Sequence, residues 1–265
     1  MVKLSIIIPA LNEEDFLSRL LESIKIQSFT DYEIILSDAG STDKTIQIAS
    51  DFGCKIVSGG LPAKGRNAGA KAATADLLLF LDADTKLPSR LFLENAIKEF
   101  KERNLDVSSC RLLPLEKSKV LNKGSVEALF KASSYLMIMF EKIAPFGVGS
   151  MILVKKELHR KVNGFDEKIT FGEDTIYIRK AAKVGKFGIL RSVKILWSVR
   201  RFDKEKWIKP GFLYLFCWFI IGLDEKKLNI FDKGFFQYRF GHYKENKSKN
   251  KYFDFEKIMK FFSKK

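Results

Sequence analysis

Strand-length apolar runs alternate with amphipathic helical patterns along the first 105 residues. Residues 4–8 (LSIII) and 77–81 (LLLFL) are apolar at nearly every position, as in strands that are buried on both faces. Residues 13–27 instead place apolar side chains on one helical face, behind Asn12 as the expected helix cap. Because strands covered on both sides are typical of parallel sheets, the pattern predicts an α/β fold with a Rossmann-like, mostly parallel sheet flanked by helices.

The same alternation assigns the remaining elements. Strands are expected at residues 32–38, 54–60 and 77–81, and helices at 40–53, 63–75 and from Pro88 onward, with Gly53 as a helix stop. Beyond residue 105 the order is less regular, with helices expected at 126–143 and 173–185, a strand at 150–156, and one or two strands within 186–202. We therefore expect a domain of residues 1–200, with halves 1–105 and 106–200, followed by a helical, amphipathic extension at 201–265.

Polar residues follow three of the predicted strands. They are residues 9–13, 38–41 and 82–84. In open α/β sheets, ligands bind beyond the carboxyl ends of the strands. We therefore expect the three clusters to converge on one edge of the sheet and to form a ligand site there.

Two carboxylates end the strand at 77–81, in the segment Asp82-Ala83-Asp84. Side chains alternate between the faces of a strand, so both can face one ligand only if this segment turns. In a turn, Asp82 and Asp84 can bind one Mg²⁺ or Mn²⁺, because these ions prefer oxygen ligands and bridge to substrate phosphates. The alternatives are a helix-capping role for Asp84 and a solvated loop.

Two further polar segments follow strands or begin helices. Asp38 heads the segment DAGSTD, so it serves either the turn that Gly40 permits or a hydrogen bond to a ligand's base or ribose. The segment AKGRNAG brings Lys64, Arg66 and Asn67 to a helix start, where an anion can bind. Neither the P-loop motif nor the dinucleotide-binding fingerprint occurs, which counts against those two phosphate-binding classes.

A third carboxylate pair, Glu173 and Asp174, begins a predicted helix. Acidic side chains in a first helical turn interact favourably with the helix dipole. Alternatively, one of them is a general base that takes a proton from an attacking hydroxyl. The residues alone favour the helix-start role.

Taken together, four ordered segments resemble the family 2 glycosyltransferases, which have a GT-A fold. The segments are SIIIPALNEE, EIILSDAGSTDKT, GRNAGAKAATADLLLFLDADT and FGEDTIYIRKAAKVG, and the match spans roughly residues 3 to 190. The resemblance implies a transferase that moves a sugar from a nucleotide-activated donor, with inversion and with a divalent metal.

Carried onto this sequence, the resemblance also implies roles for individual residues. The donor-binding set would be Pro9, Ala10, Asn12, Glu13, Asp38, Arg66, Asp82 and Ala83. Asp82 and Asp84 would form the DXD motif and bind Mg²⁺ or Mn²⁺, with Asp84 the firmer ligand. Asp174 would be the catalytic base, and the donor would be a UDP- or GDP-sugar.

The sequence departs from the family pattern at two places. Ala39 stands where many relatives carry a second acidic residue, and the Q-x-x-R-W motif of processive polymer synthases is missing. We therefore expect transfer of a single sugar. Arg200 and Arg201 would either contact the diphosphate or lie on the surface, and His242 would be either an added metal ligand or a structural residue.

Charge and apolar composition constrain the partners. The 265 residues carry a net charge of +15, which favours anionic partners. No secretory signal pattern is present, and the longest apolar run, residues 211–223, is shorter than the roughly 20 residues of a membrane span. We expect a cytoplasmic protein, and residues 207–265 would form either a buried helix or a membrane-interface segment at the inner face of the cell membrane.

The acceptor is expected to bind the less regular segments, residues 124–149 and the C-terminal quarter. Residues 135–140 hold too many apolar side chains for one buried stripe, so they form either core or an apolar acceptor groove, and the acceptor would be a lipid or lipid-linked molecule. The competing functions are a metal-dependent nucleotidyltransferase, a basic nucleic-acid-binding protein and an inactive relative. The missing aromatic-basic strand motif argues against nucleic acid as the partner.

Overall fold

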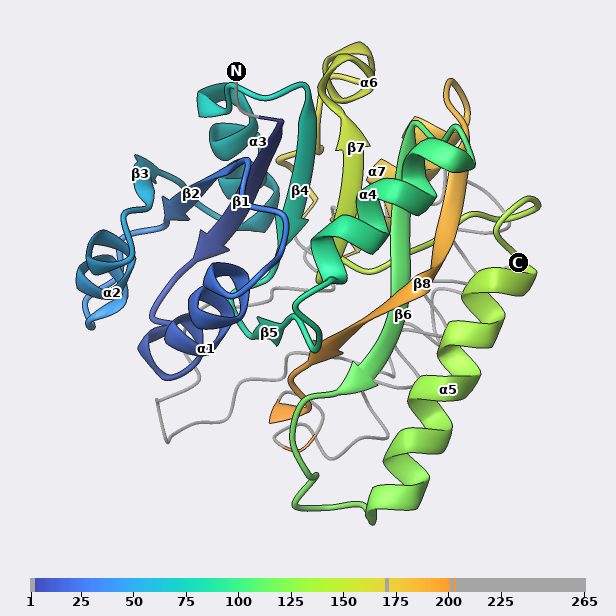
Figure 1. Cartoon of the computed structure of the whole chain (residues 1–265), viewed down its shortest axis with the longest axis horizontal. Helices are drawn as coiled ribbons and strands as arrows, with labels where there is room; N and C mark the ends of the chain where they lie inside the picture. The colour runs from blue at the N-terminus through green and yellow to red at the C-terminus, as the bar shows by residue number, and fades with distance from the viewer. Residues whose placement is uncertain (1–2, 170–171, 201–202, 204–265) are drawn as a thin grey trace, which may run out of the picture.

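The computed structural model describes residues 3–169, 172–200 and 203 (Figure 1). Its first half contains β1 (Leu4–Ala10), α1 (Glu14–Lys25), β2 (Tyr32–Asp38), α2 (Thr45–Asp51), β3 (Lys55–Ser58), α3 (Pro62–Ala72) and β4 (Leu77–Leu81). The four strands pair in the order β3-β2-β1-β4, and every pairing is parallel. This confirms the predicted strand and helix alternation.

The second half extends the same sheet with mixed strand directions. It contains β5 (Thr85–Lys86), α4 (Phe92–Glu102), β6 (Val107–Pro114), α5 (Lys123–Met139), β7 (Met151–Lys155), α6 (Lys156–Lys161), α7 (Glu173–Ala182) and β8 (Phe187–Trp197). The sheet continues as β4-β7-β6-β8-β5, in which β7 is antiparallel to both neighbours and β6 is parallel to β8. The predicted parallel arrangement therefore holds for the first four strands, and the sheet as a whole is mixed.

Helices cover both faces of this sheet, as Figure 1 shows. Successive side chains of β1 enter different cores, as alternation along a strand requires. Ile6 packs in the core that contains Leu17 of α1 and Phe92 of α4. Ile7 packs in the opposite core with Ile178 of α7. A strand buried on both faces accordingly lies at the centre of the molecule.

Two predicted helix starts are wrong in detail. Asn12 does not cap α1; it has a left-handed φ of 56°, and its side-chain oxygen accepts a hydrogen bond from Thr42 N at 2.9 Å. Asn12 therefore joins the loops after β1 and β2. Pro88 does not open α4, which begins at Phe92. Gly53 follows α2 with φ 72°, as predicted for a helix stop.

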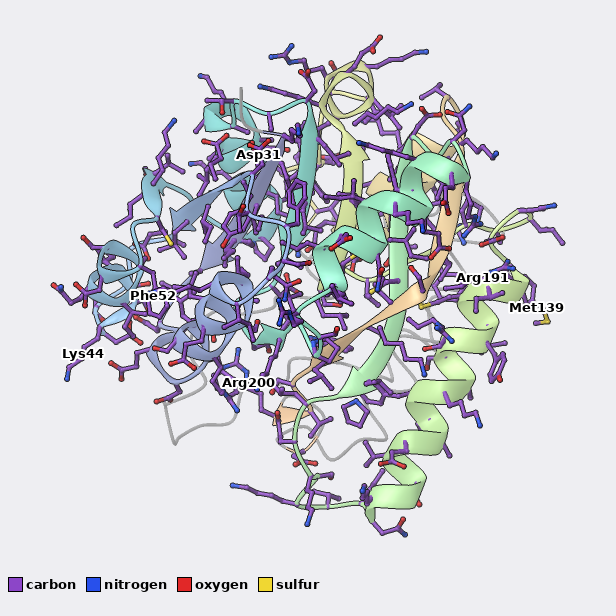
Figure 2. The ribbon with its side chains drawn as sticks, in the orientation of Figure 1. Asp31, Lys44, Phe52, Met139, Arg191 and Arg200 are labelled. Carbon is purple, nitrogen blue, oxygen red and sulfur yellow. The ribbon has the colours of Figure 1, made fainter. Side chains whose placement is uncertain are left out.

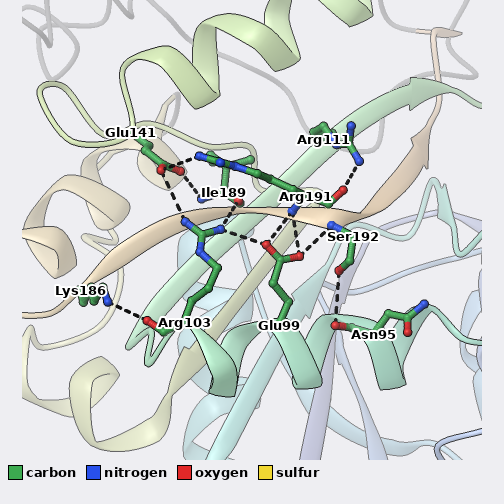
Figure 3. A network of polar contacts seen from close by, with 9 residues as sticks. All are labelled: Asn95, Glu99, Arg103, Arg111, Glu141, Lys186, Ile189, Arg191 and Ser192. Carbon is green, nitrogen blue, oxygen red and sulfur yellow. Dashed lines mark hydrogen bonds and ion pairs between the residues drawn. The ribbon is translucent and has the colours of Figure 1, made fainter.

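A polar network fastens α4 to β8 at a bulge opposite Cys110 and Arg111 of β6 (Figure 3). Glu99 accepts hydrogen bonds from the backbone N–H groups of Arg191 and Ser192, at 2.9 and 2.7 Å. Glu141, just after α5, pairs with Arg191 at 3.0 Å. The network fixes the end of α5 relative to the sheet. Within the described residues, no helix has the length and apolar character that a membrane span requires.

Candidate active site

The carboxyl ends of β2, β1 and β4 lie side by side, because β1 pairs in parallel with both neighbours. Ala10 is in register with Asp38, and β4 ends one residue before Asp82. The predicted convergence of the three polar clusters at one edge of the sheet is therefore present. The side chains of Ala10 and Ala83 are themselves buried in the core, so they would meet a ligand through their backbone.

Asp38 has one occupied and one open carboxylate oxygen. Its Oδ2 accepts hydrogen bonds from Gly40 N at 2.8 Å and Ser41 N at 2.9 Å, and Gly40 adopts φ 94°. Its Oδ1 is buried and has no hydrogen-bond partner among the described residues. Both predicted roles are thus compatible, since one oxygen holds the turn and the other can accept a bond from a ligand.

The Asp82-Ala83-Asp84 segment forms the predicted turn. Asp82 O accepts hydrogen bonds from Thr85 N at 3.2 Å and Thr85 Oγ1 at 2.7 Å. The side chain of Asp82 then pairs with Arg66 at 2.7 Å, and that of Asp84 with Arg200 at 3.2 Å. Each carboxylate of the turn therefore has its own arginine.

Asp84 lies in a strongly acidic environment. The pKa of Asp84 is raised to about 7, mainly by burial and also by neighbouring Glu13, Asp82 and Glu116, against the lowering effect of Arg200. Arg200 also pairs with Glu13 at 2.7 Å, and its guanidinium lies 4.1 Å from the ring centre of Phe16. One arginine thus balances several carboxylates. Its contact with Glu13 was not predicted from the sequence.

Glu13 is part of the same acidic group. Its backbone N–H donates to Thr45 Oγ1 at 2.8 Å, which holds the residue at the start of α1. Burial raises the pKa of Glu13, although Arg200 lowers it. Its Oε2 is buried and has no hydrogen-bond partner within the described part of the chain. Pro9, the residue before Ala10 in β1, is buried and lies close against α3, where a side chain at Gly65 would come within 3.1 Å of its Cβ.

Arg66, on α3, is almost fully buried and bridges two segments that are distant in sequence. Its Nη2 lies 2.7 Å from Asp82 and its Nη1 lies 2.7 Å from Glu173, with 3% of the side chain exposed. The guanidinium also lies 5.4 Å from the ring centre of Phe165. Burial alone would lower the pKa of Arg66, but Asp82, Glu173 and Asp174 raise it. Arg66 is therefore permanently charged and links the two carboxylate groups.

Asp174 is held at the start of α7 by backbone donors. Its Oδ2 accepts a hydrogen bond from Gly149 N at 2.6 Å, and its Oδ1 accepts one from Thr175 N at 2.7 Å. The pKa of Asp174 is raised to about 7, mainly by burial and also by Glu173, against the lowering effect of Arg66. A carboxyl group with such a pKa can accept a proton near neutral pH.

Gly149 was not predicted as part of this arrangement. A Cβ at this position would lie 2.4 Å from Arg66 Nη2 and 3.3 Å from Asp174 Oδ2. The close approach therefore needs a glycine. Of the other candidates named from sequence, Arg201 and His242 lie outside the described residues.

The acidic group around Asp84 has the chemistry of a divalent-metal site. Mg²⁺ is usually bound by one or two carboxylates, with substrate phosphates and water completing its shell. Asp82 and Asp84 can supply that pair, and the buried unpartnered oxygen of Glu13 adds negative charge. In the described residues no group of three or more metal-binding side chains occurs.

Comparison with known proteins identifies the family. The Glycosyl transferase family 2 profile matches residues 5–162. The poly(ribitol-phosphate) β-N-acetylglucosaminyltransferase TarS of Staphylococcus aureus is 26% identical over 192 residues, covering 68% of this chain and 32% of TarS. The uncharacterized glycosyltransferase EpsJ of Bacillus subtilis is 30% identical over 193 residues, covering 64% and 53%. The chain thus matches about a third to a half of the length of these relatives.

Solved structures show the same fold. The mannosyltransferase PcManGT of Pyrobaculum calidifontis, in complex with GDP-Man and Mn²⁺, superimposes with a TM-score of 0.64 at 22% identity, covering 77% of this chain and 59% of PcManGT. Residues 1–349 of Staphylococcus aureus TarS, in complex with UDP-GlcNAc, give a TM-score of 0.58 at 22% identity, covering 74% of this chain and 58% of that fragment. These likenesses confirm the predicted GT-A architecture. With the profile matching more than half of its length, the chain belongs to glycosyl transferase family 2.

Proposed function

We propose that the protein transfers a single sugar from a nucleotide-sugar donor to an acceptor hydroxyl or phosphate, with inversion at the anomeric carbon. The observation that carries the proposal is the position of two carboxylate groups on either side of one buried arginine. Asp82 lies on one side of Arg66, and Glu173 with its neighbour Asp174 lies on the other. Inversion by one in-line displacement needs such a division, since one group serves the leaving nucleotide and another serves the nucleophile.

The donor would bind along the ends of β1, β2 and β4. The open Oδ1 of Asp38 would accept a hydrogen bond from the nucleoside. Pro9, Ala10, Asn12 and Ala83 would line the same edge, mainly through backbone. Solved relatives bind UDP-GlcNAc and GDP-Man, which supports a UDP- or GDP-sugar as donor here.

Asp82 and Asp84 would hold a divalent metal, Mg²⁺ or Mn²⁺, together with the diphosphate. When bound, the ion would supply positive charge to the departing nucleoside diphosphate. Arg200, which already contacts Glu13 and Asp84, would add a second positive charge on the same side. The presence of Mn²⁺ with GDP-Man in PcManGT supports this assignment.

Asp174 would act as the general base. Its raised pKa suits a general base, because a carboxylate with a pKa near neutral pH can both accept the acceptor's proton and release it afterwards. Gly149 N fixes one carboxylate oxygen, which would orient the group toward the acceptor. The acceptor would be a lipid or lipid-linked molecule, and the protein would work in the cytoplasm at the inner membrane face, with residues 207–265 as a membrane contact.

The proposal is tested with a panel of UDP-, GDP- and dTDP-sugars in Mn²⁺ or Mg²⁺, measured by thermal stabilisation and by release of nucleoside diphosphate. One donor should stabilise the protein and be consumed, and Asp84→Asn and Asp174→Asn should lose activity by at least about a hundredfold. Asp51→Asn, at an exposed position, is the matched control. Release of sugar 1-phosphate in place of nucleoside diphosphate would identify a nucleotidyltransferase instead. Full activity in both active-site variants would contradict the proposal.

A further inference from the structure

Helix α5 is apolar on two opposite faces. Val126, Phe130 and Met137 face the core and are at most 5% exposed. Tyr135 and Met139 are four residues apart and lie on the other side, and Ile143 follows four residues later, beyond the helix end. They are 63%, 61% and 82% exposed. Figure 2 shows Met139 extending away from the sheet. The excess of apolar residues noted in the sequence therefore lies on the surface.

This outer face, defined here by Tyr135, Met139 and Ile143, is unlike the other exposed apolar positions. Elsewhere in the described chain such side chains are spread over separate elements, as with Ile26, Leu61, Leu91 and Val184. Scattered single residues need no explanation, but a continuous exposed apolar stripe marks an interaction surface. The stripe spans roughly two turns, from Tyr135 past the end of the helix.

Lysines border the outer face. Lys131 is four residues before Tyr135, Lys142 is three residues after Met139, and both are exposed. The two acidic side chains near this face form ion pairs with other residues. Glu127 pairs with Lys123 at 3.7 Å, and Glu141 pairs with Arg191 of β8 at 3.0 Å. An apolar stripe with a basic rim matches the interfacial region of an anionic bilayer, where lysine stems reach the head groups.

The basic rim also argues against two other occupants. A second copy docked through the same face would bring its lysines against those of the first, which is unfavourable. Residues 204–265, which lie outside the described part, are themselves rich in lysine. An anionic lipid surface is the partner whose charge complements the rim.

The outer face is tethered to the acceptor side of the active site. From Ile143 the chain runs through Pro145, whose carbonyl oxygen accepts a hydrogen bond from Arg179 at 3.2 Å. It then reaches Gly149, whose N–H holds Asp174. A surface that binds at Ile143 therefore lies six residues along the chain from the contact that fixes the proposed base.

We propose that the outer face of α5 docks on an anionic lipid bilayer and so places Asp174 near membrane-borne acceptors. The second half of this statement rests on the proposed function, whereas the docking itself does not. The contact is distinct from residues 207–265, for which the sequence leaves a buried helix and a membrane-interface segment as alternatives.

Vesicle flotation of the full chain, without nucleotide sugar, tests the docking. Vesicles of phosphatidylcholine are compared with vesicles that also contain phosphatidylglycerol. Tyr135→Gln/Met139→Gln/Ile143→Gln should weaken binding to the anionic vesicles by about tenfold or more, since binding scales with buried apolar area. The control Ile26→Gln/Leu91→Gln/Val184→Gln removes as many exposed apolar side chains elsewhere and should bind like the wild type.

Two further variants test the docking in case the triple variant does not fold. Ile143→Gln changes one highly exposed side chain beyond the helix and should weaken binding several-fold. Lys131→Gln/Lys142→Gln should weaken binding only to the anionic vesicles, whereas Lys71→Gln/Lys161→Gln should not. Because no donor is present, failure of the glycosyltransferase proposal would leave these results unchanged.

Several outcomes overturn the docking proposal. Equal flotation of the wild type and the triple variant would do so, as would no vesicle binding by the wild type. Concentration-dependent dimers in sedimentation velocity that the triple variant abolishes would assign the face to a second copy. A large drop in Tm for the triple variant with unchanged flotation would show that the outer face packs against other residues of the same chain.

Discussion

Arg66 lies 2.7 Å from a carboxylate oxygen of Asp82, and this ion pair joins α3 to the turn after β4. The Nη1 group of the same guanidinium donates a hydrogen bond to Glu173, which is 107 residues away in sequence. With 3% of its side chain exposed, Arg66 is shielded from competing ions and water. The proposed donor and acceptor sides of the site are therefore held together by one side chain.

Removing this arginine should destabilise the protein strongly. Arg66→Met would leave the partly buried carboxylates of Asp82 and Glu173 without their cation, and breaking a buried pair from one side costs up to about 3–5 kcal/mol. Urea denaturation measures the free energy of unfolding. As a control, Lys98→Met removes an exposed pair with Glu102, which is 3.9 Å away, and should change stability by less than about 1 kcal/mol. A similar, small loss in both variants would contradict the bridging role.

A methyl group at position 149 should disturb the same bridge. In Gly149→Ala the Cβ would lie 2.4 Å from Arg66 Nη2, so the guanidinium must move away from Asp82. We expect a loss of about 1–3 kcal/mol and a clear loss of nucleotide-sugar turnover. Gly124→Ala is the matched control, because a Cβ there would meet nothing closer than 3.5 Å. Unchanged turnover in Gly149→Ala would show that the bridge is not required.

The first half of this fold was predictable because its determinants are local. Each strand from β1 to β4 is a short apolar run, and the chain returns to the sheet through one amphipathic helix each time. Right-handed parallel connections then place Asp38 and Asp82 at one edge. The turn at Asp82 and Asp84 followed from alternation alone.

The rest of the site depends on contacts that no local pattern encodes. Strand β6 was missed because its sequence, VSSCRLLP, opens with polar residues and lies in a region of irregular order. The pairing of Arg200 with Glu13 joins residues 187 apart in sequence. Gly149 became visible only through the position of Arg66. Such contacts arise from packing between distant elements, so a single sequence does not reveal them.

Buried His159 should make stability depend on pH. Its Nδ1 lies 2.9 Å from Tyr177 Oη, and burial lowers the pKa of His159 to about 4. Because the unfolded chain binds a proton more readily, the stability present above pH about 6.5 should be lost as the pH falls toward about 4, by about 3 kcal/mol. Urea denaturation from pH 7 to pH 4 measures this as a stability difference between the wild type and His159→Gln. A difference independent of pH would contradict it.

Asp174 should make the stability of the protein fall as the pH rises, opposite to the effect of His159. The same ionisation should make the activity rise with pH. The pKa of Asp174 is raised to about 7, mainly by burial, so the folded state favours the protonated form; the stability this gives is present below pH about 4 and is lost as the pH rises through about 7. The base must be ionised to act, so kcat/KM should rise with pH and level off above about 7. Initial rates across pH 5 to 9 measure this rise of kcat/KM with pH. The control Asp166→Asn should show the same pH dependence of kcat/KM as the wild type. If kcat/KM of the wild type did not change with pH, Asp174 would not be the base.

Arg200 should compete with a divalent metal for the acidic group at Asp84. Its guanidinium lies 3.2 Å from Asp84 and 2.7 Å from Glu13, so its positive charge already offsets the carboxylates that a metal would meet. In Arg200→Gln the negative charge is less balanced, and Mn²⁺ without nucleotide should bind about tenfold more tightly. Isothermal titration calorimetry gives the affinity, and Arg160→Gln, an exposed change on α6, is the control. Asp84→Asn should abolish Mn²⁺ binding in either background. If Arg200→Gln instead weakens Mn²⁺ binding, the arginine supports the metal site and does not compete with the ion.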